Sequence, residues 1–187
     1  SHALDRRVFH EFFQQAAKAV ASKGISIALP LSVAGLSSAT LVNDLLEQLD
    51  NSPLPPRLLH LIIPAEAILD HAESVQKLRL AGCRIVLSQV GRDLQIFNSL
   101  KANMADYLLL DGELCANVQG NLMDEMLITI IQGHAQRLGM KTIAGPVVLP
   151  LVMDTLSGIG VDLIYGDVIV DAQPLDLLVN SSYFAIN

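Results

Sequence analysis

The chain has 187 residues, of which 51% are hydrophobic and 17% charged, and its formal net charge is −7. This length allows one well-buried core but falls short of the roughly 250 residues of a complete eight-unit β/α barrel. Because the net charge is acidic and Lys and Arg form no cluster, polymeric DNA and RNA are excluded as expected partners.

Neither the cysteines nor the first residues indicate export. Cys83 and Cys115 lack a C-x-x-C spacing, which favours buried, reduced thiols over a disulfide or a zinc site. No signal peptide precedes Leu4, and residues 1–3 are interpreted as a tag remnant or linker. No apolar run reaches the ~18 residues of a membrane span. We therefore expect one soluble, cytoplasmic domain over residues 1–187.

Stretches with helical spacing of apolar residues alternate with short, continuously apolar runs. Phe9 and Phe12 lie on one face of the first helix and Gly24 ends it, whereas Pro30 cannot donate to a ladder and weakens the first strand. In chain order we predict a helix over 5–23, a strand over 26–31, a helix over 38–49, a stiff connector over 51–56, a strand over 58–63, a helix over 72–81, a strand over 84–88, a helix over 93–100, a strand over 107–111, a short helix near Glu113, a helix over 123–138, a strand over 141–144, a helix over 149–157 and a strand over 163–168.

The order of these elements predicts an α/β fold with a parallel sheet. Continuously apolar strands are typical of sheets buried on both faces, and helices between them supply parallel crossovers. Six such units cannot close an eight-stranded barrel, so either strands are missing from the chain or the sheet is open.

The motifs of nucleotide binding and of nucleophilic catalysis are absent from the sequence. There is no G-x-G-x-x-G and no P-loop, and Gly158 and Gly160 are interpreted as a helix C-terminus. Ser88 lies outside G-x-S-x-G, and His134 is predicted to be a half-exposed helix residue. No catalytic triad is supported, because none of the histidines falls at a strand-to-helix turn: His2, His10, His60, His71 and His134.

Carboxylates at strand ends are also scarce. Asp111 ends a strand, with Glu113 two residues later and Asp167 near the last strand. One carboxylate does not hold a divalent cation, and Asp111 followed by a glycine is predicted to cap the short helix. We expect no metal, no cofactor and no catalytic residue.

Several segments, in this order and spacing, resemble the EAL family of cyclic di-GMP phosphodiesterases from Leu4 to Leu178. The segments are ALDRRV at 3–8, VG at 90–91, LK at 100–101, DYLLLD at 106–111, GMK at 139–141, GVDLIYG at 160–166 and QPL at 173–175. The resemblance implies a modified (β/α)8 barrel, similar to a TIM barrel, that is incomplete at its N-terminal side because the Glu-Ala-Leu segment and the first strands would precede Leu4. In active relatives the strand ends carry two divalent metals and a catalytic Lys.

The resemblance places other residues at the family's metal-site positions. The Asn of the Asn-Leu-Ser turn aligns with Pro30, and the two Glu of Glu-x-Thr-Glu align with Ile62 and Ala65. The two Asp of Asp-Asp-Phe-Gly align with Ser88 and Gln89.

The remaining positions are also degenerate, with one exception. The Lys of Lys-x-Asp aligns with Leu109, but its Asp survives as Asp111. The two Glu of Ala-Glu-Gly-Val-Glu align with Gly145 and Val148, and the Gln of Gln-Gly aligns with Tyr165. Two-metal hydrolysis depends on such ligands, so no phosphodiesterase activity is expected.

The resemblance therefore implies a catalytically inactive domain of a GGDEF–EAL diguanylate cyclase, acting as a regulatory and interaction module. The alternatives are a cyclic di-GMP receptor that does not hydrolyse its ligand, with Gln89, Asp111 and Tyr165 as candidate contacts, and an enzyme with different chemistry. The parent would lie at the inner membrane and make cyclic di-GMP through a separate GGDEF domain. We expect other domains of the same polypeptide, signalling proteins or a second copy as partners, and we do not expect cyclic di-GMP to bind.

Overall fold

The computed structural model describes residues 1–167 and 169. The chain divides into two compact units, the first ending at Ile85 and the second starting at Val86. The single domain over residues 1–187 stays a prediction, because a division into two compact units does not test it. In the described residues, no helix combines the length and the hydropathy needed to cross a membrane.

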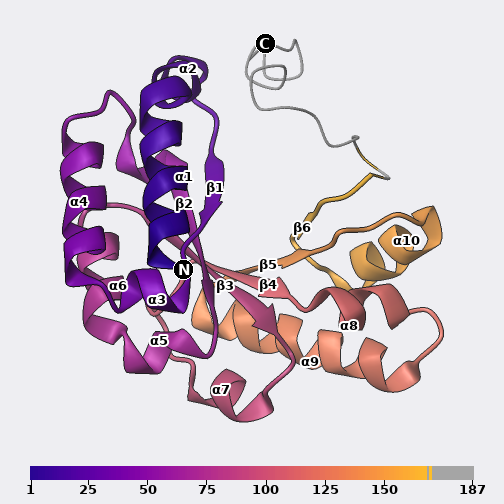
Figure 1. Ribbon diagram of the computed structural model, residues 1–187. Helices are drawn as coiled ribbons and strands as arrows, with labels where there is room; N and C mark the ends of the chain where they lie inside the picture. Colours follow the sequence, from indigo (N-terminus) through magenta and orange to yellow (C-terminus); the bar gives the residue numbers. More distant parts are fainter. Residues whose placement is uncertain (168, 170–187) are drawn as a thin grey trace. The chain divides into compact units, whose positions relative to one another are not determined.

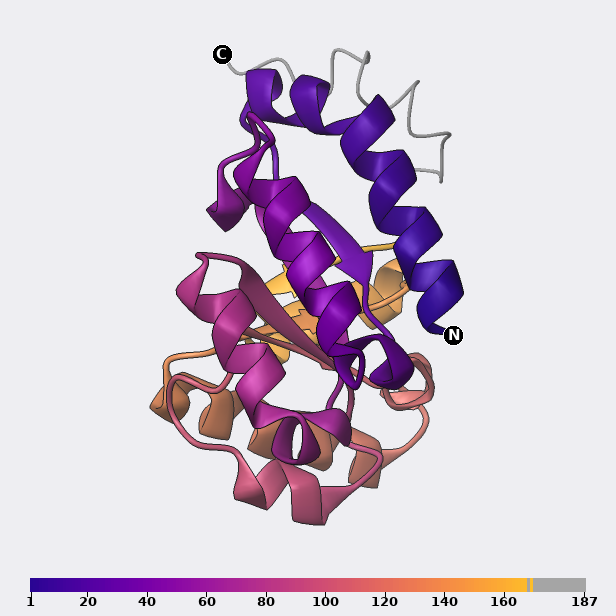
Figure 2. The ribbon, with the colours of Figure 1, turned by 60° about the vertical axis from the view of Figure 1, so that its left-hand side comes forward.

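The first unit packs helices on a pair of parallel strands (Figure 1). Figures 1 and 2 both show α1 and α4 side by side. The elements of this unit are α1 (His2–Gln15), α2 (Ala17–Lys23), β1 (Ile27–Pro30), α3 (Val33–Leu36), α4 (Ala39–Asp50), η1 (Pro56–Leu58), β2 (Leu59–Pro64), α5 (Ala67–Asp70) and α6 (Ala72–Leu80).

The predicted helix over 5–23 is interrupted at Ala16. Ala16 leaves the helical region with φ −121°, and α2 starts at the next residue. Both Ala16 and Ala17 are buried, so the bend lies where two small side chains meet the core. As predicted, Gly24 ends the second helix in the left-handed conformation.

Pro30 is the last residue of β1 and pairs with Ile62 of β2. The ladder nevertheless continues, because the next backbone amide, that of Leu31, donates to the Ile62 carbonyl at 2.9 Å. In a parallel pair successive residues do not all donate to the same neighbour, so a proline at this position removes no bond that the pair requires.

The second unit contains four strands in parallel register. Figure 1 shows α8, α9 and α10 beside them. The elements are β3 (Arg84–Val90), which starts in the first unit, α7 (Leu94–Ser99), β4 (Tyr107–Leu110), α8 (Gly112–Asn117), α9 (Leu122–Leu138), β5 (Lys141–Ala144), α10 (Pro150–Ile159) and β6 (Leu163–Ile164). Within this unit β3 pairs with β4, β4 with β5 and β5 with β6, all parallel. The predicted α/β class is confirmed.

The last strand is shorter than the predicted 163–168, although Val168 lies outside the described residues. The strand ends at Ile164, and Gly166 adopts φ 141° two residues later. Gly166 approaches the backbone of Val147 so closely that a Cβ would lie 2.9 Å from its carbonyl carbon and closer still to its nitrogen and oxygen. A side chain here would separate these segments, which explains why a glycine follows shortly after the strand.

A small polar network joins the buried side chains of Gln132 and Thr142 to the exposed Asp162. The Thr142 hydroxyl, which is fully buried, donates to the side-chain oxygen of Gln132 and lies 3.1 Å from the carboxylate of Asp162. Asp162 also accepts from the Thr142 amide at 2.8 Å, and its own amide donates to the Thr142 hydroxyl at 3.2 Å. Burial raises the pKa of the Asp162 carboxyl, but these hydrogen bonds and the nearby charge of Lys141 outweigh burial and leave the pKa below its usual value.

Thr142→Val keeps the shape of the side chain and removes the hydroxyl that joins Gln132 to Asp162. We expect the free energy of unfolding to fall by about 2 kcal/mol, because buried polar groups lose their partners. Urea titration followed by circular dichroism measures the change. Thr129→Val on the exposed face of α9 is the matched control and should stay within about 0.5 kcal/mol of wild type; equal effects of the two substitutions would contradict the role of the network.

Candidate functional site

The candidate site is the edge of the second unit at which the parallel strands end. Carboxyl ends of parallel strands meet at one edge of a sheet, so residues that follow them come together. Ser88 and Gln89 lie at the end of β3, and the other predicted residues follow the next three strands: Asp111 after β4, Gly145 after β5 and Tyr165 after β6.

The end of β3 is irregular. The register with β4 shifts between Leu87 and Val90, and Gln89 adopts a positive φ of 61°. Its side chain is exposed at this edge. Gly91 follows with φ 108°, and a Cβ there would lie 2.8 Å from Leu114, so the glycine retained from the family pattern serves close packing.

Asp111 caps α8, as predicted. One carboxylate oxygen accepts from the amides of Glu113 at 3.1 Å and Leu114 at 3.4 Å, while the backbone amide of Asp111 donates to the Val90 carbonyl at 2.9 Å. The side chain is 7% exposed. The acid that survives from the family pattern thus has a structural role that requires no ligand.

The sequence prediction missed the partner of this acid. Nε of Arg92 donates to the second carboxylate oxygen of Asp111, and the Arg92 side chain remains 57% exposed. An arginine just after the Gly91 turn was the available signal, since that turn returns the chain to the strand ends. Only Nε of Arg92 takes part in this bond, so the guanidinium keeps other N–H groups that can donate to a further acceptor.

Gly145 and Tyr165 fill each other's space. Gly145 has φ 150°, and a Cβ on it would overlap the Tyr165 carbonyl oxygen and lie 2.7 Å from two ring carbons. The backbones are tied by Tyr165 N to Ala144 O at 3.0 Å and Val147 N to Tyr165 O at 2.8 Å. Gly145 therefore has no room for a side chain.

The Cys115 thiol and the Tyr165 hydroxyl stay uncharged near neutral pH. Burial raises the pKa of the Cys115 thiol to about 11, with the Asp111 carboxylate adding to the increase and a hydrogen bond with the Gly145 backbone opposing it. Burial likewise raises the pKa of Tyr165, with a contribution from Cys115. Cys115 is buried and acts as packing, in agreement with its predicted role.

The other aligned positions provide little polar chemistry. Leu109 is half-buried in β4, and Val148 is 62% exposed beyond β5. In the first unit, Pro30 and Ile62 are paired residues of β1 and β2, and Ala65 is buried just after β2. Within residues 1–167 and 169, no three His, Cys, Asp or Glu side chains gather as a metal site.

The turn after β1 is nevertheless held firmly. Asp5, buried in the first turn of α1, accepts from the Ser32 hydroxyl at 2.5 Å. The Ser32 oxygen accepts from the Gly35 amide at 3.1 Å, and a Cβ on Gly35 would overlap the Asp5 carboxylate. These contacts hold the turn after β1 in a defined conformation.

Comparison with known proteins identifies this architecture. Residues 1–173 match the family described as EAL domain. "Probable diguanylate cyclase DgcE" of Escherichia coli K12 is 98% identical over all 187 residues, and the chain spans 17% of its length. The FimX EAL domain of Xanthomonas citri, solved in complex with c-diGMP, has a TM-score of 0.81 at 22% identity, over 97% of this chain and 73% of that one. The PaMucR phosphodiesterase in its c-di-GMP complex has a TM-score of 0.81 at 20% identity, over 94% of this chain and 74% of that one. These likenesses confirm the predicted EAL-type fold.

One prediction from the sequence is corrected by these findings. Solved chains of this fold are bound to cyclic di-GMP, which contradicts the expectation that this ligand does not bind. The expectation was wrong because it treated the lost metal ligands as if they were all the groups that a nucleotide could contact. The strand ends retain polar atoms of Gln89, Arg92 and Tyr165.

Gly145→Ala should destabilise the chain by more than about 2 kcal/mol, because the methyl group meets the Tyr165 backbone and L side chains rarely adopt this conformation. Thermal unfolding measures the loss. Gly158→Ala, in α10 with open space around its Cβ, is the matched control and should be neutral or stabilising by about 0.5–1 kcal/mol. A Gly145→Ala chain as stable as wild type would refute the packing argument.

Proposed function

Because the chain belongs to the EAL domain family, we propose that it is a catalytically inactive EAL domain that regulates a diguanylate cyclase in cyclic di-GMP signalling. The observation that carries this proposal is the state of Asp111. This surviving family acid is buried, caps α8 and is bound by Arg92. Both oxygens of this acid already accept hydrogen bonds within the chain, and the neighbouring guanidinium charge of Arg92 opposes a metal cation at the same place.

The aligned neighbours support the same conclusion. Two-metal hydrolysis needs several oxygen ligands to hold both ions, activate water and stabilise the charge that develops on the phosphate. Pro30, Ile62, Ala65 and Gly145 carry no side-chain oxygen. Ser88 and Gln89 are neutral, and neither replaces a carboxylate in charge.

A second candidate function is to bind cyclic di-GMP without hydrolysing it. The bound nucleotide would then be the signal to which the regulatory domain responds. It is favoured by the exposed polar atoms at the strand ends of the second unit together with the solved EAL domains that hold this nucleotide. Tyr165 is 44% exposed and presents an aromatic ring on which a base could stack. Arg92 presents guanidinium N–H groups that suit a phosphate or the edge of a guanine.

The role in a longer protein is part of the proposal. The related DgcE is about six times longer than this chain, because the match covers 17% of it. We place the cyclase activity in a separate GGDEF domain of such a parent, with this domain on the cytoplasmic side of the inner membrane. These assignments follow from the family resemblance.

The purified chain, supplied with Mg²⁺ or Mn²⁺, should not hydrolyse cyclic di-GMP. Chromatographic detection of the linear dinucleotide and GMP measures turnover, with a metal-dependent EAL phosphodiesterase as the positive control. Product above the blank that disappears with chelator would overturn the proposal of inactivity.

Isothermal titration tests the receptor role. Wild type should bind cyclic di-GMP saturably, and Tyr165→Ala should weaken binding roughly tenfold, since loss of one aromatic platform costs on the order of 1–3 kcal/mol per stacked base. Leu163→Ala, which removes another exposed apolar side chain from the same segment, should leave the affinity unchanged. No heat of binding in wild type would exclude the receptor role but leave the proposal of inactivity intact.

A further inference from the structure

Arg92 is the one cationic side chain in the described turns that follow the strands of the second unit. These turns are residues 91–93 after β3, 111–113 after β4, 145–149 after β5 and 165–167 after β6. The same turns carry four acids, which are Asp93, Asp111, Glu113 and Asp167. Because like charges repel, an anion that binds at this edge depends on the guanidinium of Arg92.

A buried acid holds Arg92 in place. Nε of Arg92 donates to Asp111, whose side chain is only 7% exposed. The other carboxylate oxygen of Asp111 accepts from the amides of Glu113 and Leu114, so the acid cannot turn away from the start of α8. A guanidinium has four further N–H groups on its terminal nitrogens, which the bond from Nε does not use. The half-exposed Arg92 side chain therefore presents charge and donors from a fixed position.

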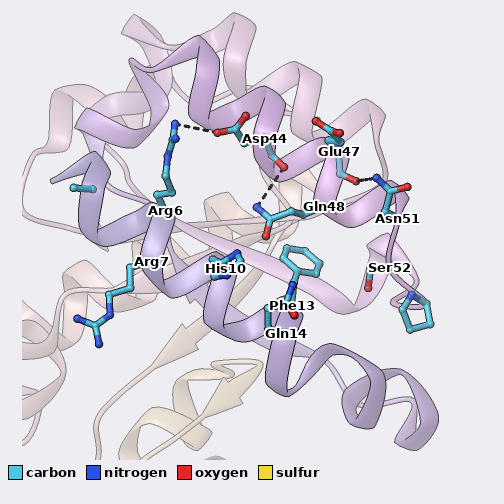
Figure 3. A pocket seen from close by; sticks show the side chains of 12 residues that line it. Arg6, Arg7, His10, Phe13, Gln14, Asp44, Glu47, Gln48, Asn51 and Ser52 are labelled. Atoms are coloured by element: carbon cyan, nitrogen blue, oxygen red, sulfur yellow. Dashed lines mark hydrogen bonds and ion pairs between the residues drawn. The ribbon is translucent and has the colours of Figure 1, made fainter.

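Arg6 of the first unit shows what this anchor adds. Arg6 pairs with Asp44 at 2.9 Å (Figure 3), but 38% of the Asp44 side chain is exposed. An ion pair between two exposed side chains is screened by water and holds neither of them firmly in one geometry. Asp111 is buried and fixed by two backbone amides, so it orients Arg92 before a ligand arrives. Such preorganisation lowers the entropic cost of binding.

A divalent cation does not fit beside Asp111. Its oxygens already accept hydrogen bonds from Arg92 and from the start of α8, and the charge of the guanidinium repels a second cation at this distance. Such ions need several oxygen ligands, and no group of three His, Cys, Asp or Glu side chains gathers among the residues that the structure describes. The positive charge next to this acid is therefore supplied by the chain itself.

We infer that Arg92 takes the place of a metal ion at this edge and binds the phosphodiester group of a cyclic dinucleotide, which is then held without any divalent cation. The terminal N–H groups donate to the two non-bridging phosphate oxygens in the forked geometry that a guanidinium favours. The ends of β4 and β6 are two strand spacings apart, or roughly 10 Å, so one dinucleotide can reach both Arg92 and the ring of Tyr165. This inference rests on the second candidate function and names the group of the nucleotide that Arg92 contacts.

Isothermal titration of the whole chain with cyclic di-GMP, in Mg²⁺ and again in EDTA, tests the inference. The wild-type affinity should be the same in both buffers. Arg92→Gln should weaken binding at least about tenfold, because hydrogen bonds to a charged group are lost. Arg92→Lys keeps the charge without the fork and should bind more tightly than Arg92→Gln. Added salt should lower the wild-type affinity more steeply than that of Arg92→Gln, because salt screens a contact between two charges and not one with a neutral guanine.

Arg137→Gln is the matched control and should leave the affinity unchanged. Arg137 is an exposed arginine whose Nε donates to the Gly133 carbonyl at 3.3 Å, and it lies near the end of α9, just before β5 begins and hence at the opposite edge of the sheet. Thermal unfolding verifies that each variant folds; should Arg92→Gln not fold, the wild-type comparison in Mg²⁺ and EDTA decides alone.

The possible results separate this inference from the receptor role. The inference alone is overturned if wild type binds only in Mg²⁺, if Arg92→Gln binds as tightly as wild type, or if Arg92→Gln and Arg137→Gln weaken binding equally. Absence of wild-type binding in both buffers would exclude the receptor role and the inference with it.

Discussion

Parallel pairing of β3 to β6 decides where the chemistry of the second unit can lie. The ladder aligns Val90 with Leu110, Leu109 with Ile143 and Ala144 with Ile164, so the residues that follow these strands share one edge. These bonds join backbone groups and require no particular side chain at the edge. The fold therefore does not depend on which side chains this edge carries.

Asp111 and Gly145 have two different structural roles at this edge. Asp111 remains an acid because its oxygens satisfy the first amides of α8 and the guanidinium of Arg92, so replacing it would leave buried groups unpaired. Gly145 has the opposite constraint, since Tyr165 occupies the volume that a side chain would need. A glutamate at 145 would meet the Tyr165 backbone as well as its ring. The absence of a side chain at this position is therefore coupled to the path of the chain after β6.

The sequence predicted those features that depend on neighbours along the chain. The strand over 141–144 was placed as the structure has it, and Gly24 and Gly160 end helices because their spacing follows local rules. The bond from Arg92 to Asp111 spans 19 residues, and the contact of Gly145 with Tyr165 depends on the register of β5 and β6. No local pattern encodes such contacts. The break at Ala16 was missed for a related reason, since alanines favour a helix and only packing against the core interrupts it.

Binding a cyclic dinucleotide and cleaving it depend on different physical terms. Cleavage requires anionic oxygens that hold two cations against their hydration, whereas binding can rest on stacking, on guanidinium contacts and on backbone groups. A chain without the anionic oxygens can therefore still offer the stacking and guanidinium contacts. For this reason the absence of carboxylates bears on hydrolysis, and it was the wrong basis for expecting that cyclic di-GMP does not bind.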